Sequence, residues 1–171
     1  MKEEKIRYFE FPGKQNTSTV LKLAKEKADK LKIKNVILAS TSGSTAERAF
    51  ETFMRARGGS TLVIVGIERE LFSSELIEDF ESKGVKIRFS REVEYKYPDL
   101  AKTVLRRFCE GMKVAVEITA MAADAGFVRT DEDVVSIAGT GKGADTAIVI
   151  KPDISRRLFN MRIKKILAKP I

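Results

Sequence analysis

Two unbroken apolar runs, one helix length apart, constrain the fold more than any other feature of the sequence. Residues 36–39 and 62–65 contain apolar side chains alone. Between them, Ala46, Ala49 and Phe53 recur at helical spacing. A strand that is apolar on both faces is typical of a parallel sheet with helices on both sides. This strand–helix–strand unit therefore predicts an α/β domain.

The rest of the chain extends this pattern without a linker, repeat or low-complexity tract. Periodicity predicts helices around residues 21–31, 46–54, 76–80, 98–109 and 112–125. Residues 57–59 are expected to end the helix at 46–54, and Gly111 is expected to separate the helix at 98–109 from the helix at 112–125. Extended segments are predicted at residues 6–11, 36–39, 62–65, 85–89, 134–138, 146–150 and 162–169. We expect residues 1–171 to form a single three-layer α/β/α domain, with a mainly parallel sheet and an antiparallel edge strand from the late strand–loop–strand element.

The absence of histidine and the single cysteine, Cys109, narrow the chemistry. Zinc, haem and imidazole base catalysis are disfavoured, and we predict no metal site. Cys109 has apolar neighbours and is expected to be a small buried hydrophobe rather than a nucleophile. No apolar run approaches the roughly 20 residues that span a bilayer, and no signal-peptide segment follows the start. We expect a soluble, cytoplasmic protein.

The net charge of +8 is concentrated near the C-terminus. Residues 151–171 hold seven basic residues against one acidic residue, a balance of +6, so the remaining chain carries only +2. Such a patch attracts phosphate groups or keeps a protein soluble. A nucleic-acid-binding module is the less favoured interpretation, because Trp is absent and only three Tyr are available for base stacking.

A turn rich in hydroxyl groups follows the first apolar run. It consists of Ser40, Thr41, Ser42, Gly43, Ser44 and Thr45, called the cradle below. A helix N-terminus offers unpaired amides and partial positive charge, and glycine allows close backbone approach, so an anion is favoured there. Ser44 and Glu47 also have the spacing of a capping box, which is an alternative explanation for part of the motif. It does not account for five hydroxyl groups in six residues.

Residues 35–46 resemble the segment of the pyruvate kinase C-terminal domain in which a strand leads into a Ser/Thr-Ser-Gly-Ser/Thr-Thr turn and a helix. In many pyruvate kinases that turn grips a phosphate of the allosteric sugar bisphosphate. The resemblance therefore implies a phosphate-gripping role for residues 40–45 and a pyruvate kinase C-terminal-domain-like fold. The catalytic barrel of pyruvate kinase has no counterpart in the sequence, so phosphoryl transfer from phosphoenolpyruvate is not implied.

Other segments resemble a smaller group of stand-alone archaeal and bacterial proteins, mostly of unassigned function. They are Asn16-Thr17, residues 116–126 and residues 143–147. Flavin mononucleotide (FMN) is a ligand associated with that group, so the resemblance makes FMN the leading ligand candidate. Because the related kinase domain takes part in subunit contacts, a homo-oligomer is also expected.

A second glycine loop spans residues 139–143 and includes Gly141, Lys142 and Gly143. It lacks the G-x-x-x-x-G-K-[ST] spacing and a strand follows it, so it is not a nucleotide-binding P-loop. The loop takes the place of the pyruvate kinase loop that closes on the effector, but it is shorter. Lys142 either meets a phosphate as a flexible point charge or is an exposed lysine of a strand connection.

Three carboxylates are candidates for acid/base or hydroxyl-binding roles. Glu117 and Asp124 fall seven residues apart on one helix face, and Asp145 follows the second glycine loop. Structural pairing is the favoured alternative, either with backbone amides or with Arg48 or Arg129, because unpaired buried charges are costly.

The favoured function is binding of a phosphorylated small molecule at the cradle, with the catalytic residues unknown. The alternative is an enzyme that acts on a phosphorylated metabolite through Glu117, Asp124 or Asp145.

Overall fold

The computed structural model describes residues 3–54, 60–93 and 95–171. One sheet of seven strands forms its centre, in the order β1-β7-β6-β5-β2-β3-β4. The strands are β1 Arg7–Phe9, β2 Asn35–Ala39, β3 Thr61–Gly66, β4 Lys86–Phe89, β5 Val134–Ala138, β6 Thr146–Lys151 and β7 Arg162–Pro170. The α-helices are α1 Thr17–Leu31, α2 Ser44–Phe53, α3 Ser74–Ser82, α4 Asp99–Arg106 and α5 Glu110–Asp124.

The sheet is mainly parallel, as predicted, and β6 alone among these strands runs against the others. It is antiparallel to both β5 and β7, whereas the β2–β3, β2–β5, β3–β4 and β1–β7 pairs are parallel. The predicted antiparallel strand is therefore present, but its expected place at the edge is wrong. Strands β7 and β1 extend the sheet beyond β6, and the edges are β1 and β4.

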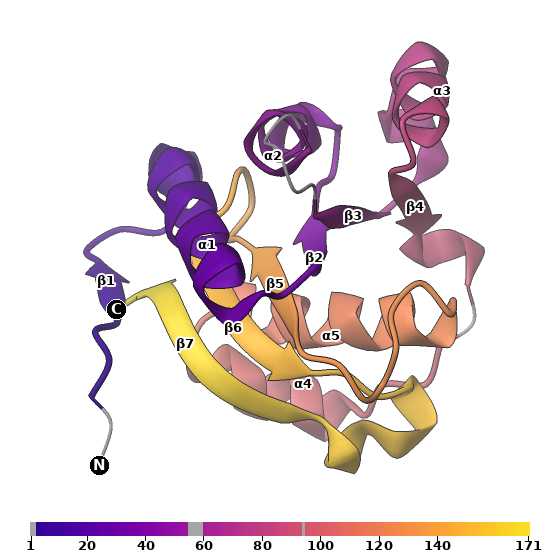
Figure 1. The fold of residues 1–171 in the computed structure, drawn as a ribbon. Coiled ribbons are helices and arrows are strands. Elements are labelled where there is room, and N and C mark those ends of the chain that lie inside the picture. Colours follow the sequence, from indigo (N-terminus) through magenta and orange to yellow (C-terminus); the bar gives the residue numbers. More distant parts are fainter. Residues whose placement is uncertain (1–2, 55–59, 94) are drawn as a thin grey trace.

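Helices cover both faces of the sheet, which gives three layers (Figure 1). On one face, α1, α2 and α3 pack through residues such as Val20, Phe53 and Phe80 against Leu38 and Ile64. On the other face, α4 and α5 pack against the alternate side chains of the same strands. Successive side chains of a strand point to opposite faces, so a strand buried on both sides must be apolar throughout.

The boundary between α4 and α5 differs from the prediction. Gly111 does not interrupt a helix but is the second residue of α5, and the break falls at residues 107–109. A Cβ atom at Gly111 would lie 2.1 Å from Thr146 Oγ1 and 2.8 Å from Asp145 Oδ1. The glycine therefore allows α5 to approach β6 closely. The expected end of α2 at residues 57–59 lies outside the described residues.

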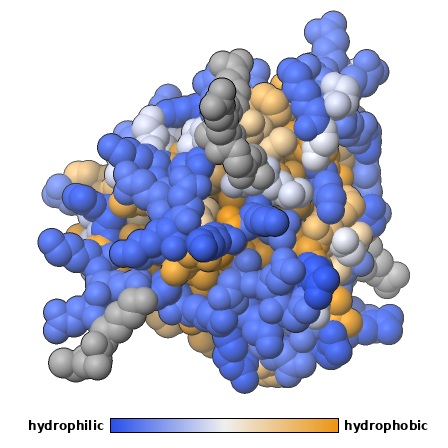
Figure 2. All heavy atoms as spheres, viewed as in Figure 1, coloured by the Kyte–Doolittle hydropathy of each residue, from blue (hydrophilic) through white to orange (hydrophobic). Residues whose placement is uncertain are grey.

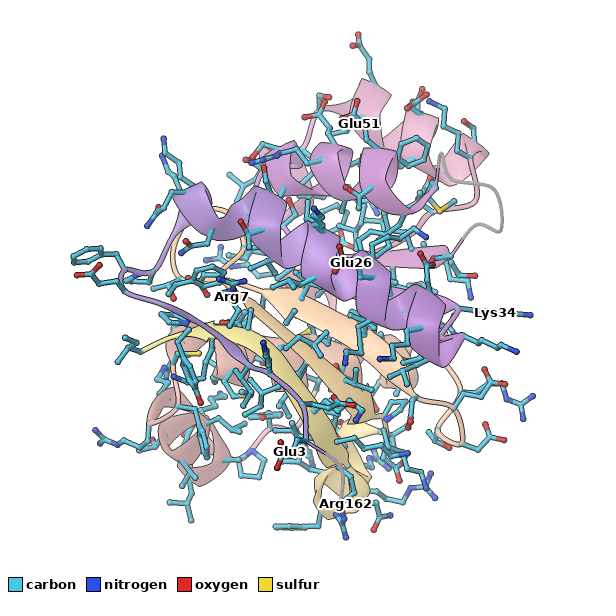
Figure 3. The ribbon with its side chains drawn as sticks, turned by 60° about the vertical axis from the view of Figure 1, so that its left-hand side comes forward. Glu3, Arg7, Glu26, Lys34, Glu51 and Arg162 are labelled. Carbon is cyan, nitrogen blue, oxygen red and sulfur yellow. The ribbon has the colours of Figure 1, made fainter. Side chains whose placement is uncertain are left out.

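The outer surface is largely polar on the face shown in Figure 2, with hydrophobic residues visible between hydrophilic ones. Charged residues such as Glu26 on α1 and Glu51 on α2 are exposed at the outer helical layer (Figure 3). In the part of the chain that the structure describes, none of the helices has the length and apolar character that crossing a membrane requires.

Candidate functional site

A cleft of about 1140 Å³ lies at the carboxyl ends of the parallel strands. Residues that follow β2, β3 and β5 line it, together with the first turns of α1, α2 and α5. Ligands of open α/β sheets collect at this edge, and three helix N-termini bring partial positive charge to it. The fold therefore brings the N-termini of three helices, whose free amides attract anions, to one cleft.

The cradle forms the turn between β2 and α2. Gly43 is the N-cap of α2 with φ 87°, in the left-handed region, and a Cβ there would lie 2.4 Å from Leu76 Cδ2. Ser44 is the first helical residue rather than the cap, and the Glu47 amide donates to the Gly43 carbonyl at 2.9 Å. The Ser44–Glu47 capping box is thus not formed among the described residues, and the hydroxyl of Ser44 is not used as a cap.

The hydroxyl groups of the cradle have no protein partners among the described residues. Throughout the described ranges, no hydrogen bond involves the side chain of Ser40, Thr41, Ser42, Ser44 or Thr45, and all five line the cleft. Ser40 is the clearest case, because the residue is only 7% exposed and its Oγ is buried without a partner. Buried polar atoms are normally satisfied, so an orphaned hydroxyl among the residues that line a cleft is a candidate ligand-binding group.

The second glycine loop forms another wall of this cleft, through Gly139, Gly141, Lys142 and Gly143. Residues at the N-terminus of α1 hold this loop in position. The Ala144 amide donates to Thr17 Oγ1 at 3.0 Å, and a Cβ at Gly143 would lie 2.5 Å from Lys14 Cα. The structure therefore brings both glycine loops to one cavity.

Three cations line the cleft without a carboxylate partner among the described residues: Lys14, Arg48 and Lys142. Arg48 donates to Ser18 Oγ instead. Unpaired cations beside helix N-termini and free hydroxyls create a site complementary to a phosphate dianion.

The opposite wall is the face of α5 that carries Glu110, Lys113 and Glu117. Lys113 Nζ lies 3.0 Å from Glu117 Oε2 and 3.3 Å from Glu110 Oε1, and the Tyr95 hydroxyl donates to Glu117 Oε1. Burial, followed by the hydrogen bond to Glu117, raises the pKa of Tyr95, so the phenol stays a donor at neutral pH. Burial opposes ionisation of Glu110, but Arg106 and Lys113 outweigh it and lower the pKa of Glu110.

Asp124 and Asp145, the other two predicted carboxylates, lie outside the cleft lining. Asp145 is fully buried and accepts from the amides of Gly13 and Thr140, each at 3.0 Å, and from Thr146 Oγ1 at 2.8 Å. Asp124 accepts from the Ser155 amide at 2.9 Å. Both make the amide-capping contacts that the structural interpretation predicts.

Pairing of these carboxylates with Arg48 or Arg129, the alternative to amide capping, is not seen among the described residues. Arg48 contacts Ser18, and Arg129 pairs with Asp131 at 2.6 Å and with Glu132 at 3.4 Å. Cys109 is half-buried at the N-cap of α5, where its sulfur accepts from the Met112 amide at 3.3 Å and lies 3.4 Å from Thr146 Oγ1.

Sequence analysis did not identify several polar cleft residues as site residues, among them Lys14, Arg48, Lys113 and Tyr95. The spacing of Glu110, Lys113 and Glu117 on an otherwise apolar helix was a usable signal for Lys113. Lys14 and Tyr95 come from segments without periodicity, and nothing local places them at the cleft.

Much of the remaining lining is apolar, through Val65, Ile67, Val114, Ile118 and Met121. The cleft thus joins an anion-binding end to a surface suited to an apolar or aromatic group. Within the described residues, no three Cys, Asp or Glu side chains are grouped to hold a metal ion.

Comparison with known proteins gives a family match over most of the chain. The model of the pyruvate kinase alpha/beta domain matches residues 18–150. Solved pyruvate kinases of Cryptosporidium parvum are similar at 13% identity over 80% of this chain, with a TM-score of 0.48. A third structure, of the Cryptosporidium parvum enzyme in complex with ADP, is 14% identical over 90% of this chain, with a TM-score of 0.47.

The chain spans only 22% to 24% of the length of those pyruvate kinases. The family match instead covers well over half of this chain and includes β2, the cradle, α2, β3 and α5. The chain therefore belongs to the pyruvate kinase alpha/beta domain family.

Proposed function

We propose that the protein binds a phosphorylated small molecule in the cleft, with its phosphate on residues 40–45, and that FMN is the leading candidate. The observation that carries the proposal is the unpartnered, buried hydroxyl of Ser40 beside four further free hydroxyls and the N-terminus of α2. A phosphate supplies the acceptors that these groups lack. Lys14, Arg48 and Lys142 add the balancing charge.

The volume and lining of the cleft support a ligand larger than inorganic phosphate. Ligand pockets typically measure about 300–1,000 Å³, and this cleft measures about 1140 Å³. Its apolar wall of Ile67, Val114 and Met121 suits a ring such as isoalloxazine. The absorption spectrum of the purified protein tests for bound flavin directly, and calorimetric titration of FMN tests a protein purified without it.

Ser40→Ala separates a ligand role from a structural one. The variant should be at least as stable as the wild-type protein, with a gain of up to about 1–3 kcal/mol, because Ser40 Oγ has no hydrogen bond to lose and is buried unsatisfied. It should nevertheless bind phosphate and FMN about 10-fold more weakly. Ser136→Ala is the matched control, since Ser136 Oγ is buried and donates to the Ala115 carbonyl at 2.8 Å. That control should lose about 1 kcal/mol of stability and retain ligand affinity. Unchanged affinity in Ser40→Ala would count against the proposal.

An enzyme acting on a phosphorylated metabolite is the second candidate, and the location of Glu117 in the cleft favours it. A carboxylate within reach of a bound ligand is placed for proton transfer. This candidate predicts turnover in a panel of phosphorylated metabolites, and loss of that turnover in Glu117→Gln with ligand affinity retained. A panel without turnover would remove it.

A further inference from the structure

Lys113 and Glu117 on α5 are unusual because their charged side chains line the cleft and are mostly buried. The side chains of Lys113 and Glu117 are 12% and 13% exposed, and both belong to a helix that is otherwise apolar toward the core. Burying an ion pair costs desolvation energy that an apolar pair of similar size avoids. Packing alone therefore does not account for a carboxylate at this position.

The carboxylate of Glu117 has acceptor capacity to spare. Each of its oxygens has two lone pairs, but among the described residues Oε1 accepts from the Tyr95 hydroxyl alone and Oε2 from Lys113 Nζ alone. These two bonds fix the orientation of the carboxylate, and the residue lines the cleft. Two adjacent acceptor oxygens are complementary to two adjacent donors, such as the hydroxyl groups of a vicinal diol.

Charge in the cleft gives a ligand one orientation. Lys14, Arg48 and Lys142 have no carboxylate partner in the described ranges, whereas Lys113 lies between two carboxylates. A phosphate is therefore attracted to the cradle and repelled by Glu117. The part of the ligand that meets Glu117 is therefore not anionic, and it carries hydrogen-bond donors.

We propose that Glu117 binds the hydroxyl groups of a phosphorylated polyol whose phosphate lies on the cradle. This proposal rests on the proposed phosphate binding and adds the chemistry of the middle of the ligand. The ribose of a sugar 5-phosphate and the ribityl chain of FMN share that chemistry, since each joins a phosphomonoester to neighbouring hydroxyls. Tyr95 and Lys113 position the carboxylate.

Calorimetric titrations with inorganic phosphate, ribose 5-phosphate and 2-deoxyribose 5-phosphate test this assignment. The wild-type protein should bind ribose 5-phosphate about 10-fold or more tightly than the deoxy sugar, because hydrogen bonds to a charged group are strong. Glu117→Gln should weaken ribose 5-phosphate binding by roughly 10- to 100-fold and remove the preference. Its affinity for inorganic phosphate should not fall.

Asp124→Asn is the matched control, since Asp124 lies on the same helix but outside the cleft lining and its contact to the Ser155 amide needs only one acceptor oxygen. It should keep the wild-type preference for ribose. Far-ultraviolet circular dichroism and thermal melting establish that both variants fold.

Equal affinity of the wild-type protein for the two sugars would overturn the role of Glu117. So would the same loss of ribose binding in Asp124→Asn and Glu117→Gln. In either case, retained binding of inorganic phosphate that is weakened by Ser40→Ala leaves the proposed function standing. Failure of all three ligands and of FMN to bind the wild-type protein overturns the proposed function itself.

Discussion

At Gly43, both the backbone angle and the surrounding space require glycine. Its φ of 87° is unfavourable for residues other than glycine, and a Cβ would lie 2.4 Å from Leu76 Cδ2 and 3.3 Å from Phe72 Cδ1. The apolar side chains of Leu76 and Phe72 therefore pack directly against the backbone of the cradle. Its hydroxyls and amides are positioned before any ligand arrives, which lowers the entropic cost of binding.

Gly43→Ala should destabilise the protein and also weaken phosphate binding. We expect a loss of about 3 kcal/mol in the free energy of unfolding, from left-handed strain and overpacking together. Gly126→Ala is the control, because Gly126 has φ 68° but an added Cβ meets nothing within 4 Å. That variant should lose about 1 kcal/mol from strain alone. Equal losses by urea denaturation would contradict the clash at Gly43.

At the scale of elements, Gly111 sets the distance between α5 and β6. Replacing a helical glycine by alanine normally stabilises a protein by about 1 kcal/mol. Gly111→Ala should do the opposite and destabilise it by about 1–3 kcal/mol, because the new Cβ meets Thr146 Oγ1 at 2.1 Å. The sign of the change in unfolding free energy is the readout, and a gain in stability would contradict the close approach of the two elements.

Glu4 joins the segment before β1 to two other elements. It lies 3.1 Å from Lys27 Nζ on α1 and 2.8 Å from Lys165 Nζ on β7. Hydrogen bonds from Lys165 and Lys27 lower the pKa of Glu4 to about 2. A carboxylate with a lowered pKa stabilises the folded state above its unfolded pKa, and this stabilisation is lost as the pH falls toward the folded value.

Glu4→Gln should therefore be less stable than the wild-type protein at pH 7 and low salt. The difference in urea midpoint should shrink as the pH falls below 4.5, the ordinary value, and disappear near pH 2. Added salt should shrink it too, since both lysine contacts are near the surface. Glu3→Gln serves as the control, because Glu3 makes no ion pair among the described residues. A difference that grows in acid would be the wrong sign.

The elements with strong periodicity were predictable because burial on both sheet faces leaves a clear sequence pattern. Residues 36–39, 62–65 and 146–150 all lie in strands inside the sheet. The sequence pattern places residues 146–150 at an edge because it does not show that β7 and β1 pair beyond them. The turn of the cradle was predictable because its backbone conformation requires a glycine within the turn itself, and Gly43 is visible in the sequence. Lys14 and Tyr95 reach the cleft through tertiary packing, which leaves no local signal.

At the scale of the whole molecule, α4 and the short segment after it present an apolar stripe to solvent. Leu100, Val104 and Phe108 recur every four residues and are 75%, 51% and 50% exposed. The contacts of α4 are mainly with α5, on its other side. Contiguous exposed apolar residues of this kind mark interaction surfaces, and a symmetric dimer buries the same patch on both subunits.

We expect the chain to form a homo-oligomer through this stripe. Leu100→Glu combined with Val104→Glu should reduce the mass measured by sedimentation equilibrium to that of the monomer, because four buried like charges would face each other in a symmetric dimer. Phosphate binding should persist, since the stripe shares no residue with the cleft lining. Phe159→Glu is the control for general surface polarity, because Phe159 is 87% exposed on a different element. A monomeric wild-type protein at micromolar concentration would contradict the assignment, whereas an oligomer that survives the double substitution would place the contact elsewhere.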